Sequence, residues 1–158
     1  MVKDIHYPCW LKRGDGCAQQ KEDTCYVQNE QEAEALLKEF WLRGITSEVV
    51  NEHLKGDLIK FYGVSGTDFF YWFYPSKCGH RSKFGLEVIN GEAQGFVFDA
   101  EALKADKAAD MLNVPVYGGD CVVSEDGSIR IIDFNDWPSF APCRDEAAFY
   151  IATKMIQE

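Results

Sequence analysis

The chain has 158 residues, of which 46% are hydrophobic and 14% aromatic, so a packed core is expected and disorder is excluded. Its formal net charge of −10 argues against a nucleic-acid surface, which needs clustered Lys and Arg. It does not argue against a nucleotide, whose charge a few lysines and a divalent cation can balance. No apolar run reaches the length of a membrane span and no basic-then-apolar leader opens the chain, so we expect a cytoplasmic protein.

One helix is predicted in the first third of the chain, between strand patterns. Asn29 followed by Glu32 is a capping-box pattern that predicts the helix start, and Gly44 ends the helical pattern. Apolar residues recur there at helical spacing, so one face of the helix should pack on a sheet. These residues are Ala33, Leu36, Leu37, Phe40 and Trp41. Strand patterns flank the helix at residues 9–12, 24–28 and 47–54.

Two hairpins and two helices are predicted in the rest of the chain. In order, these elements are strands 57–64 and 67–74, a loop 75–92, a helix 100–112 capped by Asp99, strands 116–123 and 128–134, and a helix 145–157. The face shared by apolar residues of the last helix should consist of Ala148, Ile151, Ala152, Met155 and Ile156. Because hairpins and helices mix, the order predicts an α+β fold rather than a doubly wound parallel sheet.

The second hairpin is predicted to place two acids opposite each other. If Asp126-Gly127 is a two-residue turn, Asp120 faces Asp133 across the two strands. A four-residue loop keeps this register, whereas a three-residue loop destroys it. Asn135 lies two residues beyond Asp133 and should point the same way.

These three polar side chains have two interpretations. Acids often lie on the solvated face of a sheet. However, Ile129 and Ile131 have the same strand parity as Asp133, which predicts a face that is apolar until the polar groups begin. Directly opposed like charges are destabilising, and a hard cation would turn that repulsion into coordination. Carboxylate and amide oxygens suit Mg²⁺ or Mn²⁺.

Two lysines on predicted strands also have two interpretations. Lys60 lies between Leu58 and Tyr62 on one strand face, and Lys12 lies on the first strand of the chain. Strand lysines commonly face solvent. Lysines on separate strands could instead bind phosphate groups from opposite sides.

Together, these residues resemble the ATP-grasp superfamily. Near its C-terminus, the family has an acid on one strand, a hairpin, then Asp or Glu, any residue and Asn, followed by a turn and a helix. The matching residues here are Asp120, Asp133 and Asn135. Residues 8–12 resemble the family's first strand, and residues 49–56 resemble the segment that links its lobes and precedes the strand of Lys60. The order and spacing match over nearly the whole chain.

The resemblance implies a fold of two small α/β lobes with mostly antiparallel sheets and a nucleotide cleft between them. The N-terminal lobe and hinge would span residues 1–54, and the C-terminal lobe with the metal-binding hairpin residues 55–158. Family members usually carry a further N-terminal domain that completes the acceptor site. We therefore expect a further domain or a partner chain to complete it here.

The resemblance also implies roles for single residues. Lys12 would contact the α- and β-phosphates of ATP, and Lys60 would contact phosphate and act in catalysis. The adenine pocket would be lined, mostly by backbone groups, by Asn51, Glu52, His53 and Leu54. For His53, packing is the stronger interpretation than chemistry. The ligands of Mg²⁺ or Mn²⁺ would be Asp120, Asp133 and Asn135.

The activity implied is that of an ATP- and magnesium-dependent ligase of the carboxylate–amine type, which acts through an acylphosphate. Its partner would be a small-molecule acceptor, such as an amino acid or another carboxylate, and neither a nucleic acid nor a membrane. Arg81 and Arg144 are candidates for binding the acceptor carboxylate, or are ordinary surface residues. Two alternatives stay open: a small-molecule kinase similar to the inositol phosphate kinases, and a non-catalytic nucleotide-binding module of a larger protein.

Overall fold

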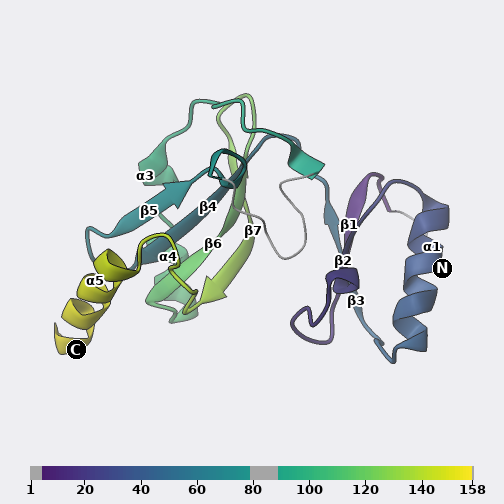
Figure 1. The fold of residues 1–158 in the computed structure, drawn as a ribbon, viewed down its shortest axis with the longest axis horizontal. Coiled ribbons are helices and arrows are strands. Elements are labelled where there is room, and N and C mark those ends of the chain that lie inside the picture. The colour runs from purple at the N-terminus through teal and green to yellow at the C-terminus, as the bar shows by residue number, and fades with distance from the viewer. Residues whose placement is uncertain (1–4, 79–88, 158) are drawn as a thin grey trace. The chain divides into compact units, whose positions relative to one another are not determined.

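The computed structural model describes residues 5–78 and 89–157. They form two compact units, the first containing residues 5–54 and the second residues 55–78 and 90–157 (Figure 1). Each unit combines helices with one small sheet in which the described strands pair antiparallel, so the predicted α+β class is confirmed. Among the described residues, no helix is both long and apolar enough to span a membrane.

The first unit is a three-stranded sheet with one helix packed on it. The strand order is β2-β1-β3, and the elements are β1 (Cys9–Arg13), the 3-10 turn η1 (Lys21–Asp23), β2 (Thr24–Val27), α1 (Glu30–Leu42) and β3 (Glu48–Glu52). Cys9, Leu11 and Val27 of the sheet form a buried cluster with Ala33 of α1. Because side chains alternate along a strand, Trp10 and Lys12 lie on the other face of this sheet.

The start of α1 confirms the capping prediction. Asn29 accepts a hydrogen bond from the backbone N–H of Glu32 at 3.0 Å, and the Glu32 carboxylate accepts one from the backbone N–H of Gln28 at 2.8 Å. The inclusion of Trp41 in the buried stripe is wrong, because this side chain is 72% exposed. At 100° per residue, Trp41 lies about 90° from the centre of the face that Ala33 and its neighbours form.

The second unit is a four-stranded sheet with helices on both faces. The strand order is β5-β4-β6-β7, and the elements are β4 (Asp57–Val64), β5 (Phe70–Phe73), the 3-10 turn η2 (Pro75–Lys77), α3 (Ala100–Leu103), α4 (Asp106–Leu112), β6 (Val116–Val123), β7 (Ile129–Asp136) and α5 (Arg144–Gln157). Residues 79–88 of the predicted loop lie outside the described part of the chain.

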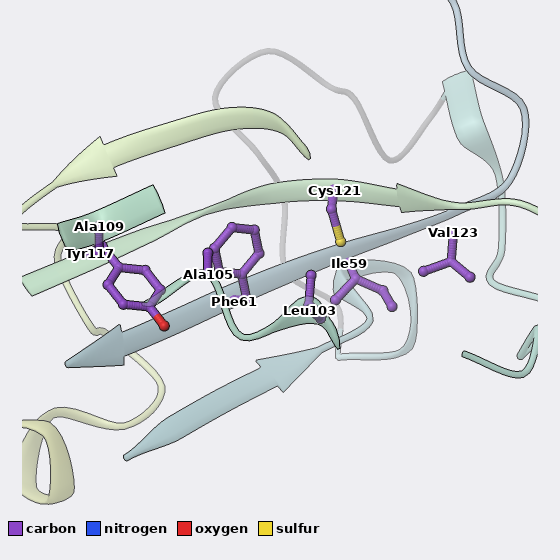
Figure 2. Close-up of a cluster of buried hydrophobic side chains, with 8 residues drawn as sticks. All are labelled: Ile59, Phe61, Leu103, Ala105, Ala109, Tyr117, Cys121 and Val123. Atoms are coloured by element: carbon purple, nitrogen blue, oxygen red, sulfur yellow. The ribbon is translucent and has the colours of Figure 1, made fainter. Parts of the chain in front are cut away.

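One face of this sheet packs against α3 and α4 through a cluster of buried side chains, which Figure 2 draws as sticks. The buried cluster consists of Ile59, Phe61, Leu103, Ala105, Ala109, Tyr117, Cys121 and Val123. The predicted continuous helix 100–112 is wrong, because the chain leaves the helical conformation at Lys104. An unbroken helix would place Leu103 and Ala105 about 200° apart, yet both side chains are buried in this one cluster. The break therefore lets both residues pack on the same sheet face.

The other face of the sheet is covered at one end by α5 and the turn before it. Tyr62, Val64 and Val116 of the sheet pack there with Phe140 and with Ala147 of α5. The predicted face of α5 is only partly right, since Ile151 packs on this cluster while Met155 and Ile156 are 58% and 85% exposed. The packed face instead consists of Ala147, Tyr150 and Ile151, at helical spacing.

Candidate functional site: a polar row on the second sheet

The tip of the β6–β7 hairpin differs from the predicted two-residue turn. The backbone N–H of Ser124 donates to the carbonyl of Ser128 at 3.0 Å, so three residues form the loop. Gly127 closes this loop with φ +80°, and its N–H donates to the carbonyl of Ser124 at 2.9 Å. A glycine in the left-handed region is typical of three-residue hairpin loops. Such a loop shifts the register by one residue, which by itself would move Asp133 to the other face.

A β-bulge restores the register before the acids are reached. Cys121 pairs with Ile131, whereas the next residue of β6, Asp120, pairs with Asp133. Ile132 is therefore the extra residue of the bulge, and it compensates for the three-residue loop. The predicted pairing of Asp120 with Asp133 is confirmed, although it arises from a loop and a bulge rather than from a regular hairpin.

The loop and the bulge also exchange the two faces on which the side chains of β7 lie between the bulge and the turn, compared with the predicted hairpin. Ile131 pairs with Cys121, whose side chain is buried on the α3–α4 face, so Ile131 does not share a face with Asp133. The expectation that Ile129 and Ile131 line the face of the acids is wrong. Arg130, which pairs with Val122, lies on that face instead. Parity in an unbroken strand could not have identified Arg130, because the bulge leaves no clear local sequence signal.

Lys60, Asp120 and Asp133 form one row across three strands. Lys60 is directly paired with Asp120 in the β4–β6 ladder, and Asp120 with Asp133 in the β6–β7 ladder. The ammonium group of Lys60 lies 2.6 Å from Oδ1 of Asp120. The side chains of Lys60 and Asp120 are 17% and 7% exposed, whereas Asp133 is exposed to solvent. The row thus carries two carboxylates and one ammonium group, which leaves a net negative charge.

Asn135 lies in the neighbouring row on the same face. It pairs with Gly118, which in turn pairs with Tyr62. The amide nitrogen of Asn135 donates to Oδ2 of Asp133 at 2.7 Å, so its amide oxygen is not used in that bond. A Cβ atom on Gly118 would lie 2.8 Å from both Tyr62 and Pro138, so any larger residue at this position would clash with these two side chains.

Burial raises the pKa of two groups next to Asp120. Desolvation and then the charge of Asp120 raise the pKa of the Cys121 thiol to about 12, so this thiol stays protonated at neutral pH. Desolvation, followed by the charges of Cys143 and Asp120, also raises the pKa of Tyr62. Neither group offers an anionic ligand at neutral pH, so the oxygens of the carboxylate pair are the stronger candidates for holding a cation.

The predicted nucleotide-binding residues of the first unit lie around β1 and the end of β3. Lys12 pairs with Thr24 and Val49 and is half-buried on the sheet face opposite α1. Asn51 pairs with Trp10 on that same face, while Glu52 pairs with Cys9 on the α1 face. Both Asn51 and Glu52 are exposed. Leu54, like His53, follows β3 and is half-buried.

His53 belongs to an aromatic cluster that sequence reasoning did not single out. The indole N–H of Trp10 donates to Nδ1 of His53 at 3.3 Å, and the rings of Tyr26 and His53 pack edge to face at 5.0 Å. Trp10 and Tyr26 are directly paired in the β1–β2 ladder, and their aromatic character on two predicted strands was the available signal. Because Nδ1 accepts this bond, the proton of a neutral His53 belongs on Nε2.

The donor set formed by Asp120, Asp133 and the neighbouring Asn135 fits a hard divalent cation. Two carboxylates and an amide oxygen are ligands that Mg²⁺ and Mn²⁺ accept, and two of the three side chains are exposed. Over residues 5–78 and 89–157, no three or more His, Cys, Asp or Glu side chains are grouped as a metal site, so the amide would have to complete this set. Arg144 begins α5 and is exposed, and the candidate acceptor ligand Arg81 lies outside the described residues.

No protein-family model matches this chain, and no curated protein is significantly similar to it in sequence.

Proposed function

We propose that this chain binds ATP with Mg²⁺ and acts as a ligase of the carboxylate–amine type. The observation that carries the proposal is the direct pairing of Asp120 with Asp133 beside Lys60. Asp120, Asp133 and Asn135 would hold the metal, and the row's excess of negative charge supports this role. Bound there, Mg²⁺ would neutralise phosphate charge during transfer.

The chain's own residues would act by binding and orienting the substrates. Lys60 would bind a phosphate group of ATP, while an acceptor carboxylate attacks the γ-phosphorus and ADP leaves. An amine would then attack the acylphosphate carbon and release phosphate. Lys12 and residues 51–54 are proposed, by resemblance to the ATP-grasp superfamily, to bind the phosphates and the adenine. An ATP-grasp fold with a nucleotide cleft is part of this proposal.

The position of Arg130 favours an anionic acceptor, and it supports a kinase as a second candidate function. This arginine is exposed on the same sheet face as Asp133. A guanidinium group binds a carboxylate or a phosphate group equally well by geometry. Phosphate release that requires both a carboxylate and an amine indicates the ligase, whereas phosphate transfer to a hydroxyl group indicates the kinase. Binding of ATP without either reaction indicates a nucleotide-binding module.

The decisive experiment is calorimetric titration of ATP, with and without Mg²⁺, into the wild type and Asp133→Ala. We expect magnesium-dependent binding in the wild type and a loss of at least ~10-fold in affinity in the variant. Asp136→Ala is the matched control, because Asp136 is an exposed acid of the same strand that pairs with Tyr117 and so lies on the opposite face. This control should bind as the wild type does.

The stability of the variants separates a metal ligand from a structural residue. Asp133 is exposed, so its removal should change the free energy of unfolding by no more than about 0.5 kcal/mol. Urea unfolding followed by circular dichroism measures this change. Loss of the fold in Asp133→Ala, or equal loss of ATP binding in Asp136→Ala, would contradict the proposed metal site.

A further inference from the structure

The ion pair between Lys60 and Asp120 involves one of the two carboxylates that are proposed to hold the cation. Nζ of Lys60 lies 2.6 Å from Oδ1 of Asp120, and both side chains are largely buried. On its other side, Asp120 faces the carboxylate of Asp133. Asp120 therefore lies between an ammonium group and a second carboxylate, so a lysine and a metal ion would share this one carboxylate.

A cation held by both acids would also be close to the positive charge of Lys60. Like charges in a partly desolvated site repel more strongly than in water, because the effective dielectric constant is lower. Metal binding at this row must then either displace the ammonium group from Asp120 or act against its charge. Lys60 has a flexible four-carbon stem, which lets its ammonium group reach another anion without movement of the strand.

We propose that Lys60 is the resident counter-ion of Asp120 and competes with the divalent cation for this carboxylate. Without nucleotide, the ammonium group stabilises the row and weakens metal binding. A phosphate group that accepts the ammonium group relieves the competition, so metal and ATP favour each other's binding. This last step rests on the proposed function, whereas the competition itself requires only the ion pair and the facing acid.

The test compares wild type, Lys60→Met and Lys107→Met in two separate titrations. Methionine keeps the unbranched apolar stem of lysine and removes the charge, and Lys107 is an exposed lysine of α4 that serves as the control. With Mn²⁺ alone, followed by electron paramagnetic resonance, Lys60→Met should bind the ion roughly 5-fold or more tightly than the wild type. With ATP in the presence of EDTA, the same variant should bind the nucleotide more weakly. Lys107→Met should match the wild type in both titrations.

A thermal-shift measurement keeps the test informative if Lys60→Met is less stable. Asp120 then no longer has the ammonium group of Lys60 beside it, so Mn²⁺ should raise the melting temperature of the variant by more than it raises that of the wild type. Unchanged Mn²⁺ affinity together with an equal thermal shift would overturn the inference, even if the wild type binds ATP with Mg²⁺. Tighter Mn²⁺ binding by Lys60→Met in a chain that binds no ATP would support the competition and overturn the proposed function.

Discussion

Each unit of the molecule buries a carboxylate beside a cationic side chain, but the surroundings of the two carboxylates differ. In the first unit, Asp23 is fully buried and accepts hydrogen bonds from Arg43 and from the backbone N–H groups of Gln19 and Gln20. In the second unit, Asp120 is paired with Lys60 but faces a further acid across the sheet. A carboxylate surrounded by donors of its own chain holds structure together. One that faces another carboxylate suits an added cation.

The pKa of Asp23 shows how complete its surroundings are. Burial alone would raise this pKa, but the hydrogen bonds from Arg43 and from the two backbone N–H groups outweigh it and lower the pKa to about 2. The charged form is therefore strongly favoured in the folded state. Removing the charge, or the side chain, should cost stability.

Asp23→Ala should have the largest effect, a loss of about 3 kcal/mol in the free energy of unfolding. The substitution leaves Arg43 and two backbone N–H groups without their acceptor. The value lies at the lower end for a broken buried ion pair, because Arg43 is partly exposed. Urea unfolding measures the loss. Asp15→Ala is the control, because Asp15 is an exposed acid of the same unit that pairs with Arg13, and it should change stability little. Equal losses of stability in Asp23→Ala and Asp15→Ala would show that the burial of Asp23 does not give it a special structural role.

Lowering the pH should weaken the first unit in a defined window. Because the folded-state pKa of Asp23 is depressed, its contribution is fully present above the ordinary value of 3.8 and is lost as the pH falls towards about 2. The effect should be smaller than that of Asp23→Ala, because a protonated side chain still fills the site. Thermal unfolding measured between pH 5 and pH 2 should show the melting temperature falling mainly between pH 3.8 and about pH 2, the ordinary and the folded-state pKa of Asp23. Asp23→Asn should lose this part of the pH dependence, and a wild-type profile in that variant would assign the effect to another carboxylate.

Asp133→Asn should have the smallest effect and the opposite sign. In metal-free buffer with EDTA, it relieves the repulsion from Asp120 and should stabilise the chain by about 0.2–0.5 kcal/mol. Urea unfolding of the variant and the wild type, side by side, measures this difference. Excess Mg²⁺ should narrow or reverse this difference in stability, because the cation should stabilise the wild type more than it stabilises the variant. A destabilised variant in EDTA would show that Asp133 is held by its own chain, as Asp23 is.

Much of the element order could be predicted from local sequence, and the exceptions have tertiary causes. Capping residues such as Asn29 and turn residues such as Gly127 act within a few positions, so their effects are readable. The break at Lys104 arises because Leu103 and Ala105 must both reach the same core. That requirement belongs to the sheet below the helices and has no local signature.

The pairing of the two acids in the candidate site was predicted correctly, although for the wrong reason. The three-residue loop and the bulge offset each other, and the spacing of the residues does not reveal this. A two-residue turn without a bulge and a three-residue loop with one both pair Asp120 with Asp133. The spacing of the acids cannot distinguish them. The two arrangements differ in which of Arg130 and Ile131 shares the acids' face, and only the register in the structure assigns that place to Arg130.

The bulge at Ile132 has a further consequence, because β7 is the outermost strand of its sheet among the described strands. An outermost strand presents backbone groups to which a foreign strand can attach, a common route to aggregation. Here the extra residue interrupts the regular spacing that such an attachment needs, and exposed charges at Arg130, Asp133 and Asp136 oppose it. The bulge that places Asp133 opposite Asp120 thus also disfavours the attachment of a further strand to β7.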